Sequence, residues 1–244
     1  MSNHLPAAVQ SYLAEYRYKI ELHAHTSPVS GCSHIPPAEI IRRLADKGYH
    51  AVAITNHFSY DNQFMKAEDP VAVYLADYYA AKEAGEAIGM KVYLGAEYRF
   101  TENSNDYLVY GVDETFLRET LHCHDMGFAA FYERYHGDDR LILQAHPFRP
   151  GLVRAPSDHM DGIEAFNMHP NHNSHVAEAA RWAKEQAIPI LTIGTDLHDP
   201  GHEGLCATRT KTLPETTAEL IALLRSQDYL MEIAGCPLLP YAAF

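Results

Sequence analysis

The chain has 244 residues, 47% of them hydrophobic, so it can bury a full core and fits either one α/β barrel or two small domains. Its net charge is −13, with 19 Lys and Arg against 32 Asp and Glu. This balance argues against a general affinity for nucleic-acid backbones, because that affinity requires clustered Lys and Arg. No linker, repeat or low-complexity run divides the sequence, and we therefore expect a single domain over residues 1–244.

Several protein classes are disfavoured by what the sequence lacks. No C-x-x-C pair occurs, which argues against a zinc ribbon or a redox pair. No basic segment followed by a long apolar run marks a signal peptide, and the apolar stretches are too short for a membrane span. We therefore expect a soluble cytoplasmic protein with reduced thiols, and the sequence does not indicate an oligomeric state. The four cysteines are scattered: Cys32, Cys123, Cys206 and Cys236.

Short apolar segments alternate with amphipathic ones along the chain. The predicted strands cover residues 19–24, 51–55, 91–96, 106–112, 141–145, 162–166 and 188–193. The predicted helices cover residues 5–17, 36–48, 71–88, 114–135, 174–186 and 215–226. Several strands are continuous apolar runs, as parallel strands buried on both faces are. The alternation predicts either a (β/α) barrel or a doubly wound open sheet.

Side chains that bind metals stand at the ends of these strands. The first strand carries His23 and His25, which point to one face because they are two residues apart. Two imidazoles aimed at one point suit Zn, Mn or Fe better than Mg or Ca. Similar polar residues follow the later strands: Asn56, His57, Glu97, His146, Asp196 and His198. This distribution favours the barrel, because barrel sites are built at many strand ends and open sheets use one switch point.

The order of the motifs resembles the PHP family, the polymerase and histidinol phosphatase family of metal-dependent phosphoesterases. The motifs are Glu-Leu-His23-Ala-His25-Thr, Ile-Thr-Asn56-His57, Gly-Ala-Glu97, Ala-His146-Pro and Gly-Thr-Asp196-Leu-His198, and they span residues 21–198. The resemblance implies a distorted seven-stranded (β/α) barrel with two or three divalent metal ions, Zn, Mn or Fe, at the C-terminal ends of the strands. It also implies hydrolysis of a phosphate ester.

The resemblance also implies a role for each motif residue. Glu97 corresponds to the carboxylate that bridges two metals, and Asp196 is expected to bridge metals or orient water. Glu21 and Asn56 are expected to orient ligands rather than bind metal; the family usually has Asp where this chain has Asn56. The implied metal ligands are His23, His25, His57, Glu97, His146, Asp196 and His198.

Two family ligands are missing from their usual places. Family members with three metals carry a histidine in the first loop, where this chain has Gly31, and either Cys32 or His34 stands close enough in sequence to replace it. They also carry a histidine at the end of strand four, where this chain has only Val112 and Asp113. The number of metals therefore remains open between two and three.

Three further residues are candidates for binding the substrate phosphate. Arg99 and Arg149 directly follow motif residues, and each is either a phosphate ligand or part of a surface salt bridge. His169 lies in a polar stretch expected at the barrel mouth. The histidines left as surface residues are His122, His124, His136 and His159.

The expected activity is hydrolysis of a small phosphate monoester by a metal-activated water. The expected partner is a small phosphorylated substrate, with no duplex nucleic acid and no membrane. Three alternatives stay open: a nuclease or exonuclease acting on phosphodiesters, a metal hydrolase of amides or lactones, and a non-catalytic metal-binding module.

Overall fold

A single curled sheet forms the framework of the protein. A computed structural model describes residues 6–238, over which the sheet has eleven strands. The strands are β1 (Tyr18–Ala24), β2 (Ala51–Ile54), β3 (His57–Ser59), β4 (Lys91–Arg99), β5 (Asp106–Tyr110), β6 (Leu141–Gln144), β7 (Gly162–Asn167), β8 (Ile190–Gly194), β9 (Cys206–Thr210), β10 (Tyr229–Ile233) and β11 (Cys236–Leu238). The helices are α1 (Ala7–Glu15), α2 (Pro37–Asp46), α3 (Pro70–Ile88), α4 (Glu114–Thr120), α5 (Phe128–Tyr135), α6 (Val176–Glu185) and α7 (Thr217–Ser226).

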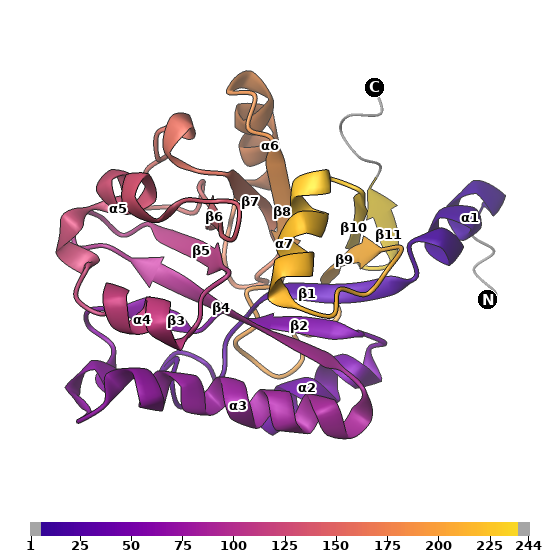
Figure 1. Cartoon of the computed structure of the whole chain (residues 1–244). Helices are drawn as coiled ribbons and strands as arrows, with labels where there is room; N and C mark the ends of the chain where they lie inside the picture. The colour runs from indigo at the N-terminus through magenta and orange to yellow at the C-terminus, as the bar shows by residue number, and fades with distance from the viewer. Residues whose placement is uncertain (1–5, 239–244) are drawn as a thin grey trace.

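Seven of these strands form the predicted distorted barrel. They pair in the order β1-β2-β4-β5-β6-β7-β8, and Figure 1 shows how the sheet curls. The two end strands approach each other only near their C-terminal ends, where Ala24 pairs with Leu197. There the His25 N–H donates to the Leu197 carbonyl at 2.9 Å, and the Leu197 N–H donates to the His23 carbonyl at 3.1 Å. The barrel is therefore closed at the edge where the predicted ligands gather.

The fourth strand of the barrel does not run in the predicted direction. β5 is antiparallel to both β4 and β6, whereas we expected parallel strands throughout. Its beginning at Asp106 therefore lies at the ligand edge, and its end lies at the opposite edge. Asp113, which follows that far end, accepts a hydrogen bond from the Phe116 N–H at 2.7 Å and caps α4. The expectation that residues 112–113 are the place for a metal ligand was therefore wrong. It assumed that this strand runs parallel to its neighbours, which would have placed its end at the ligand edge.

Three strands after β8 were not predicted. β9 pairs antiparallel with β1 on the side away from β2, and β10 and β11 extend the sheet further. Their sequences are short and mix polar with apolar residues, so they lack the apolar runs that mark the inner strands. Since β9 occupies much of the free edge of β1, β8 reaches β1 only at the ligand edge.

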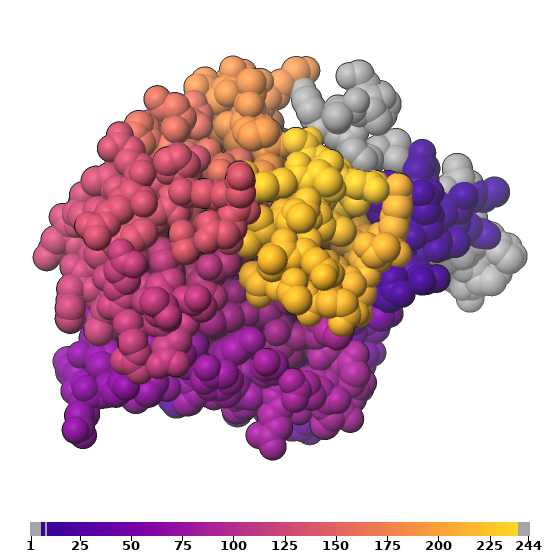
Figure 2. Space-filling model, viewed as in Figure 1, coloured from indigo at the N-terminus to yellow at the C-terminus, as the bar shows by residue number. Residues whose placement is uncertain are grey.

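The helices cover the sheet and largely match the predictions. α3 begins at the Asp69 cap, whose carboxylate accepts the Ala72 N–H at 3.1 Å, and ends at Gly89 with φ 77°. The predicted helix over 114–135 is divided into α4 and α5. Figure 2 shows α1 projecting from the body of the molecule, and residue 5, where we expected this helix to begin, lies outside the described residues.

An aromatic core supports β4, the strand that carries Glu97. Phe58, Tyr98 and Phe131 pack there. His124 belongs to this region and is only 4% exposed, so its prediction as a surface residue was wrong. Its Nδ1 lies 3.0 Å from the Arg99 carbonyl, so one of the two ring nitrogens has a hydrogen-bond partner in the interior.

Within residues 6–238, none of the helices combines the length and apolar character that a membrane span needs.

Candidate metal centre

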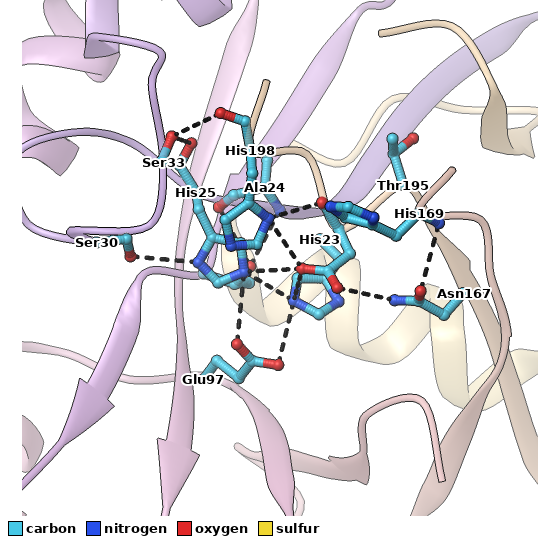
Figure 3. A network of polar contacts seen from close by, with 12 residues as sticks. His23, Ala24, His25, Ser30, Ser33, Glu97, Asn167, His169, Thr195 and His198 are labelled. Atoms are coloured by element: carbon cyan, nitrogen blue, oxygen red, sulfur yellow. Dashed lines mark hydrogen bonds and ion pairs between the residues drawn. The ribbon is translucent and has the colours of Figure 1, made fainter. Parts of the chain in front are cut away.

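Four predicted ligands from the end of β1, from β4 and from the loop after β8 converge on one point. We call His23, His25, Glu97 and Asp196 the inner ligand group; all four are at most 1% exposed. The Nε2 atoms of His23 and His25 lie 3.0 Å apart. Each lies 3.3 Å from Asp196 Oδ1, and the two Glu97 oxygens lie 3.3 and 3.4 Å from them. Figure 3 shows the two imidazoles and the Glu97 carboxylate facing one another.

The hydrogen bonds behind the two imidazoles fix which nitrogen is free. His23 Nδ1 lies 2.8 Å from the Glu164 carboxylate, which can only accept. His25 Nδ1 lies 3.3 Å from Ser30 Oγ, whose own proton goes to Asn56 Oδ1 at 3.0 Å. Both Nδ1 atoms therefore carry hydrogen, and in neutral rings both Nε2 atoms present lone pairs. Two lone pairs 3.0 Å apart require a cation between or beside them.

The charge of the cluster leads to the same requirement. Burial lowers the pKa of His23, but the surrounding carboxylates, Glu164 first, outweigh burial and hold this pKa well above its ordinary value. Burial also raises the pKa of Glu97, and the nearby histidines, His23 first, outweigh it and hold that pKa low. The buried Glu97 Oε2 has no hydrogen-bond partner among the described residues. The cluster thus recruits positive charge, either as a proton on His23 or as metal ions, and its donor set suits divalent metals.

Backbone geometry holds two of the ligands in place. His146 and Asp196 have left-handed φ values of 31° and 56°, which turn their side chains inward at a cost in strain. Glu21 lies where we expected an orienting residue: its Oε1 accepts the N–H groups of His23 and Thr195, each at 3.0 Å. Glu21 therefore joins the first ligand segment to the last. Burial raises the pKa of this carboxyl to about 7.

A second group of ligand atoms extends from Glu97 toward β5 and β6. His146 Nε2 lies 3.3 Å from Glu97 Oε1 and 3.9 Å from Asp106 Oδ2. His146 Nδ1 is buried without a hydrogen-bond partner among the described residues. Asp106, together with His57 and Glu97, offers ligand atoms within 4.8 Å of one another. A carboxylate from β5 thus stands near the place for which we sought a histidine.

His57 and His198 lie on the other side of His25, toward the mouth. The His25 ring stacks against each of theirs, with centroids 4.4 Å from His57 and 4.2 Å from His198, and the His57 and His198 centroids lie 5.9 Å apart. His57 Nδ1 lies 2.8 Å from Glu97 Oε2. His198 Nδ1 donates to the Asp196 carbonyl at 2.8 Å, which leaves its Nε2 with a lone pair.

The residues proposed for phosphate binding lie at different distances from this centre. An Arg149 Nη2 donates to Asp196 Oδ2 at 2.5 Å and to Asn167 Oδ1 at 3.0 Å, so Arg149 lies beside the inner ligand group. Arg99 makes two 2.7 Å bonds to Asp106, the salt-bridge alternative of the prediction. His169 is 7% exposed, and burial, the largest cause, lowers its pKa to about 4.

The first loop places its two candidate ligands differently. The His34 side chain is 71% exposed and bonds Asp199 at 2.6 Å, outside the ligand set. The Cys32 thiol instead makes side-chain hydrogen bonds with His57 and His198. Burial would raise the pKa of this thiol, but the two histidines outweigh burial and lower it to about 6. Cys32 is solvent-exposed.

Asn56 lies where we expected a ligand-orienting residue. Its Oδ1 accepts the Thr26 N–H at 2.7 Å and the Ser30 hydroxyl at 3.0 Å. Its Nδ2 donates to Thr26 Oγ1 at 2.8 Å. Asn56 therefore ties the first loop to the end of β2, and through Ser30 it reaches His25.

Two residues of the centre were missed at the sequence level. Glu164 lies inside β7 at 1% exposure and contacts His23, and Asp106 begins β5. A signal for Glu164 was present, because a single carboxylate inside an apolar strand buried on both faces requires a partner. No comparable signal existed for Asp106, because its role depends on the reversed direction of β5.

Comparison with known proteins places the chain in a family. The family model for the PHP domain matches residues 21–234. No curated protein matches the chain significantly. The structure resembles a two-domain protein from Bacteroides vulgatus containing a predicted PHP-like metal-dependent phosphoesterase, with a TM-score of 0.63 at 16% identity over 88% of this chain and 64% of that one. This chain therefore spans slightly less than two thirds of that protein.

Two further solved structures share the fold. PsfC from Pseudomonas syringae aligns with a TM-score of 0.57 at 17% identity, over 84% of this chain and 88% of that one. The lesion-specific endonuclease PfuEndoQ from Pyrococcus furiosus aligns with a TM-score of 0.52 at 14% identity, over 86% of this chain and 56% of that one. At such identities the resemblance establishes the common fold alone.

Proposed function

The chain belongs to the PHP domain family, and we propose that it is a metal-dependent phosphoesterase that hydrolyses a small phosphate monoester. The observation that carries this proposal is the inner ligand group, in which two buried imidazole nitrogens and two buried carboxylates converge on one point. We also propose that the chain works as a single domain, because one sheet runs without interruption from β11 to β8.

The described residues fit two metal positions that share Glu97. His23, His25 and Asp196 would complete one position, and His146 with Asp106 would contribute to the other. Divalent ions of the Zn, Mn or Fe type would supply Lewis acidity to the phosphate and lower the pKa of the attacking water. Glu97 suits the shared place because a carboxylate offers one oxygen to each ion, whereas an imidazole offers one lone pair.

The protein residues beside this centre would hold and orient the phosphate. Arg149 already contacts Asp196, and its buried Nε has no hydrogen-bond partner among the described residues. That donor would neutralise charge on the non-bridging oxygens of the ester, and the neutral imidazole of His169 would donate a hydrogen bond to them. Arg99 lines a cavity of about 400 Å³ beside His57, so it faces substrate space although it is paired with Asp106.

The net charge favours a small substrate over a nucleic acid. Phosphate backbones are bound by clustered Lys and Arg, and this chain carries 19 such residues against 32 Asp and Glu. A nuclease remains the competing function, since the structurally similar PfuEndoQ is an endonuclease. The shared fold does not decide between a monoester and a phosphodiester.

The test combines metal analysis with three substrates. The purified full chain would be analysed for transition metals and assayed on p-nitrophenyl phosphate, bis(p-nitrophenyl) phosphate and a single-stranded oligonucleotide. Glu97→Gln is the test variant, and Glu185→Gln on the exposed face of α6 is its matched control, since that side chain is 59% exposed. We expect two or more equivalents of metal and preferential monoester cleavage, with both lost only in Glu97→Gln.

Each contrary result has a defined meaning. A chain that retains no transition metal after reconstitution would show that the ligand assignment is wrong. Preferential cleavage of the diester or the oligonucleotide would replace the phosphatase with a nuclease. Tight metal binding without turnover of any ester would leave a binding module.

A further inference from the structure

A thiol stands at the mouth of the metal centre, next to two imidazoles that the inner ligand group does not use. The thiol is that of Cys32, and the imidazoles are those of His57 and His198. We propose that Cys32 is a metal ligand and that these three residues, here called the outer corner, form a metal position that takes thiophilic divalent ions such as Zn²⁺ in preference to Mn²⁺. This inference rests on the proposed function, because it extends the same centre.

The two imidazoles are prepared for ligation. His198 Nδ1 donates to a backbone carbonyl that can only accept, so the lone pair of its neutral ring is on Nε2. His57 Nδ1 lies 2.8 Å from Glu97 Oε2, and the His57 side chain also interacts with Cys32. The ligand atoms of these two histidines and His25 lie within 4.8 Å of one another.

An unpartnered buried oxygen supports a cation at this corner. Glu97 is fully buried, and its Oε2 has no aligned hydrogen-bond donor among the described residues although His57 Nδ1 is 2.8 Å away. An anionic oxygen left without a donor in the interior is costly. A cation at the outer corner, next to His57, would offset that cost in addition to ions in the inner ligand group.

The first loop is pinned so that Cys32 faces the two imidazoles. On one side of Cys32, the Ser33 hydroxyl donates to the His25 carbonyl at 2.9 Å. The next residue, His34, donates its N–H to the His198 carbonyl at 2.8 Å. The loop is thus tied to both ligand segments directly after the thiol, and rigid support of this kind is what a metal site requires.

The chemistry of the donor set predicts the preference for metal. One thiolate and two imidazoles bind Zn²⁺ and Co²⁺ well, whereas Mn²⁺ prefers oxygen ligands. The outer corner also borders a cavity of about 400 Å³ that Cys32, His57 and Arg99 help to line. A three-ligand site beside a cavity keeps a coordination position open for water or substrate.

Cobalt substitution tests the proposal by spectroscopy. Metal-free full-length protein would be titrated with Co²⁺, whose thiolate complexes give a charge-transfer band in the near ultraviolet. We compare the wild type with Cys32→Ser, Cys32→His and the control Cys236→Ser, since Cys236 is a second exposed thiol. We expect the band in the wild type and in Cys236→Ser, no band and one equivalent of cobalt fewer in Cys32→Ser, and full stoichiometry without the band in Cys32→His.

A second readout is independent of spectra. Iodoacetamide labelling of Cys32 should slow roughly tenfold or more when Zn²⁺ is added, because a metal-bound thiolate is withdrawn from alkylation. Labelling of Cys236 in the same sample should not change.

The outcomes separate this inference from the proposed function. Cobalt bound with visible d–d bands but no thiolate band in the wild type would overturn the role of Cys32 and leave the metal centre standing. If Zn²⁺ does not slow the iodoacetamide labelling of Cys32, the role of Cys32 as a ligand is likewise overturned and the metal centre still stands. No cobalt binding at all would overturn both proposals.

Discussion

The inner ligand group and the outer corner are built from different parts of the chain. The inner group comes largely from β1 and β4, and its four residues are at most 1% exposed. The outer corner depends on a loop residue, Cys32, that is exposed to solvent. Strand ends place their side chains within the hydrogen-bonding pattern of the sheet, whereas a loop needs separate ties such as the bond from Ser33 to His25. The difference suggests that the inner group supplies the core chemistry and that the outer corner adjusts the choice of metal.

Glu97→Gln should have the largest effect, because Glu97 contacts both regions. Its oxygens lie 3.3 Å from His23 and 2.8 Å from His57, and the amide replaces a shared anion with one neutral oxygen. Since metal catalysis contributes several kcal/mol, we expect a loss of roughly 1000-fold in kcat/KM on p-nitrophenyl phosphate. Loss of metal from only one region would show that the two do not share this carboxylate.

Removal of metal by a chelator should have the next largest effect, on stability. Metal at about 100 times its Kd stabilises the folded chain by about 2.7 kcal/mol, which corresponds to about 5–10 °C in Tm for a chain of this size. Scanning calorimetry with and without chelator measures the shift. Glu97→Gln should show little further decrease on chelation, and an equal decrease would place the stabilising ion elsewhere.

Glu164→Gln should have a smaller effect that is confined to the inner ligand group. Glu164 Oε1 accepts from His23 Nδ1 at 2.8 Å and contributes a buried negative charge. Residues that orient a ligand in this way typically contribute 10–100-fold to metal affinity, so we expect a loss in that range at the inner group. The thiolate–cobalt band of the outer corner should persist, and its loss would show that the two regions are coupled through His23.

The sequence predicted the inner ligand group better than it predicted the rest of the centre. The side-chain alternation of β1 and the apolar runs that end at Glu97 and Asp196 are local patterns, and a local pattern is enough to locate a strand end. The sequence did not predict Asp106 as a residue of the metal centre, because its position depends on the antiparallel direction of β5, which arises from tertiary pairing. Cys32 was left undecided because a loop side chain is directed by bonds to distant residues such as His198.

Ser33→Ala should have the smallest effect and should act on the outer corner alone. The buried Ser33 hydroxyl donates to the His25 carbonyl, and removing one such bond costs about 1 kcal/mol, or roughly a fivefold loss in affinity. Cobalt titration should show a weaker thiolate band at limiting metal, with activity at saturating metal unchanged. Ser226→Ala at the end of α7 is the matched control. Because Ser33 touches no proposed ligand atom, an undiminished band would mean that other bonds, such as that from His34 to His198, hold Cys32 in place.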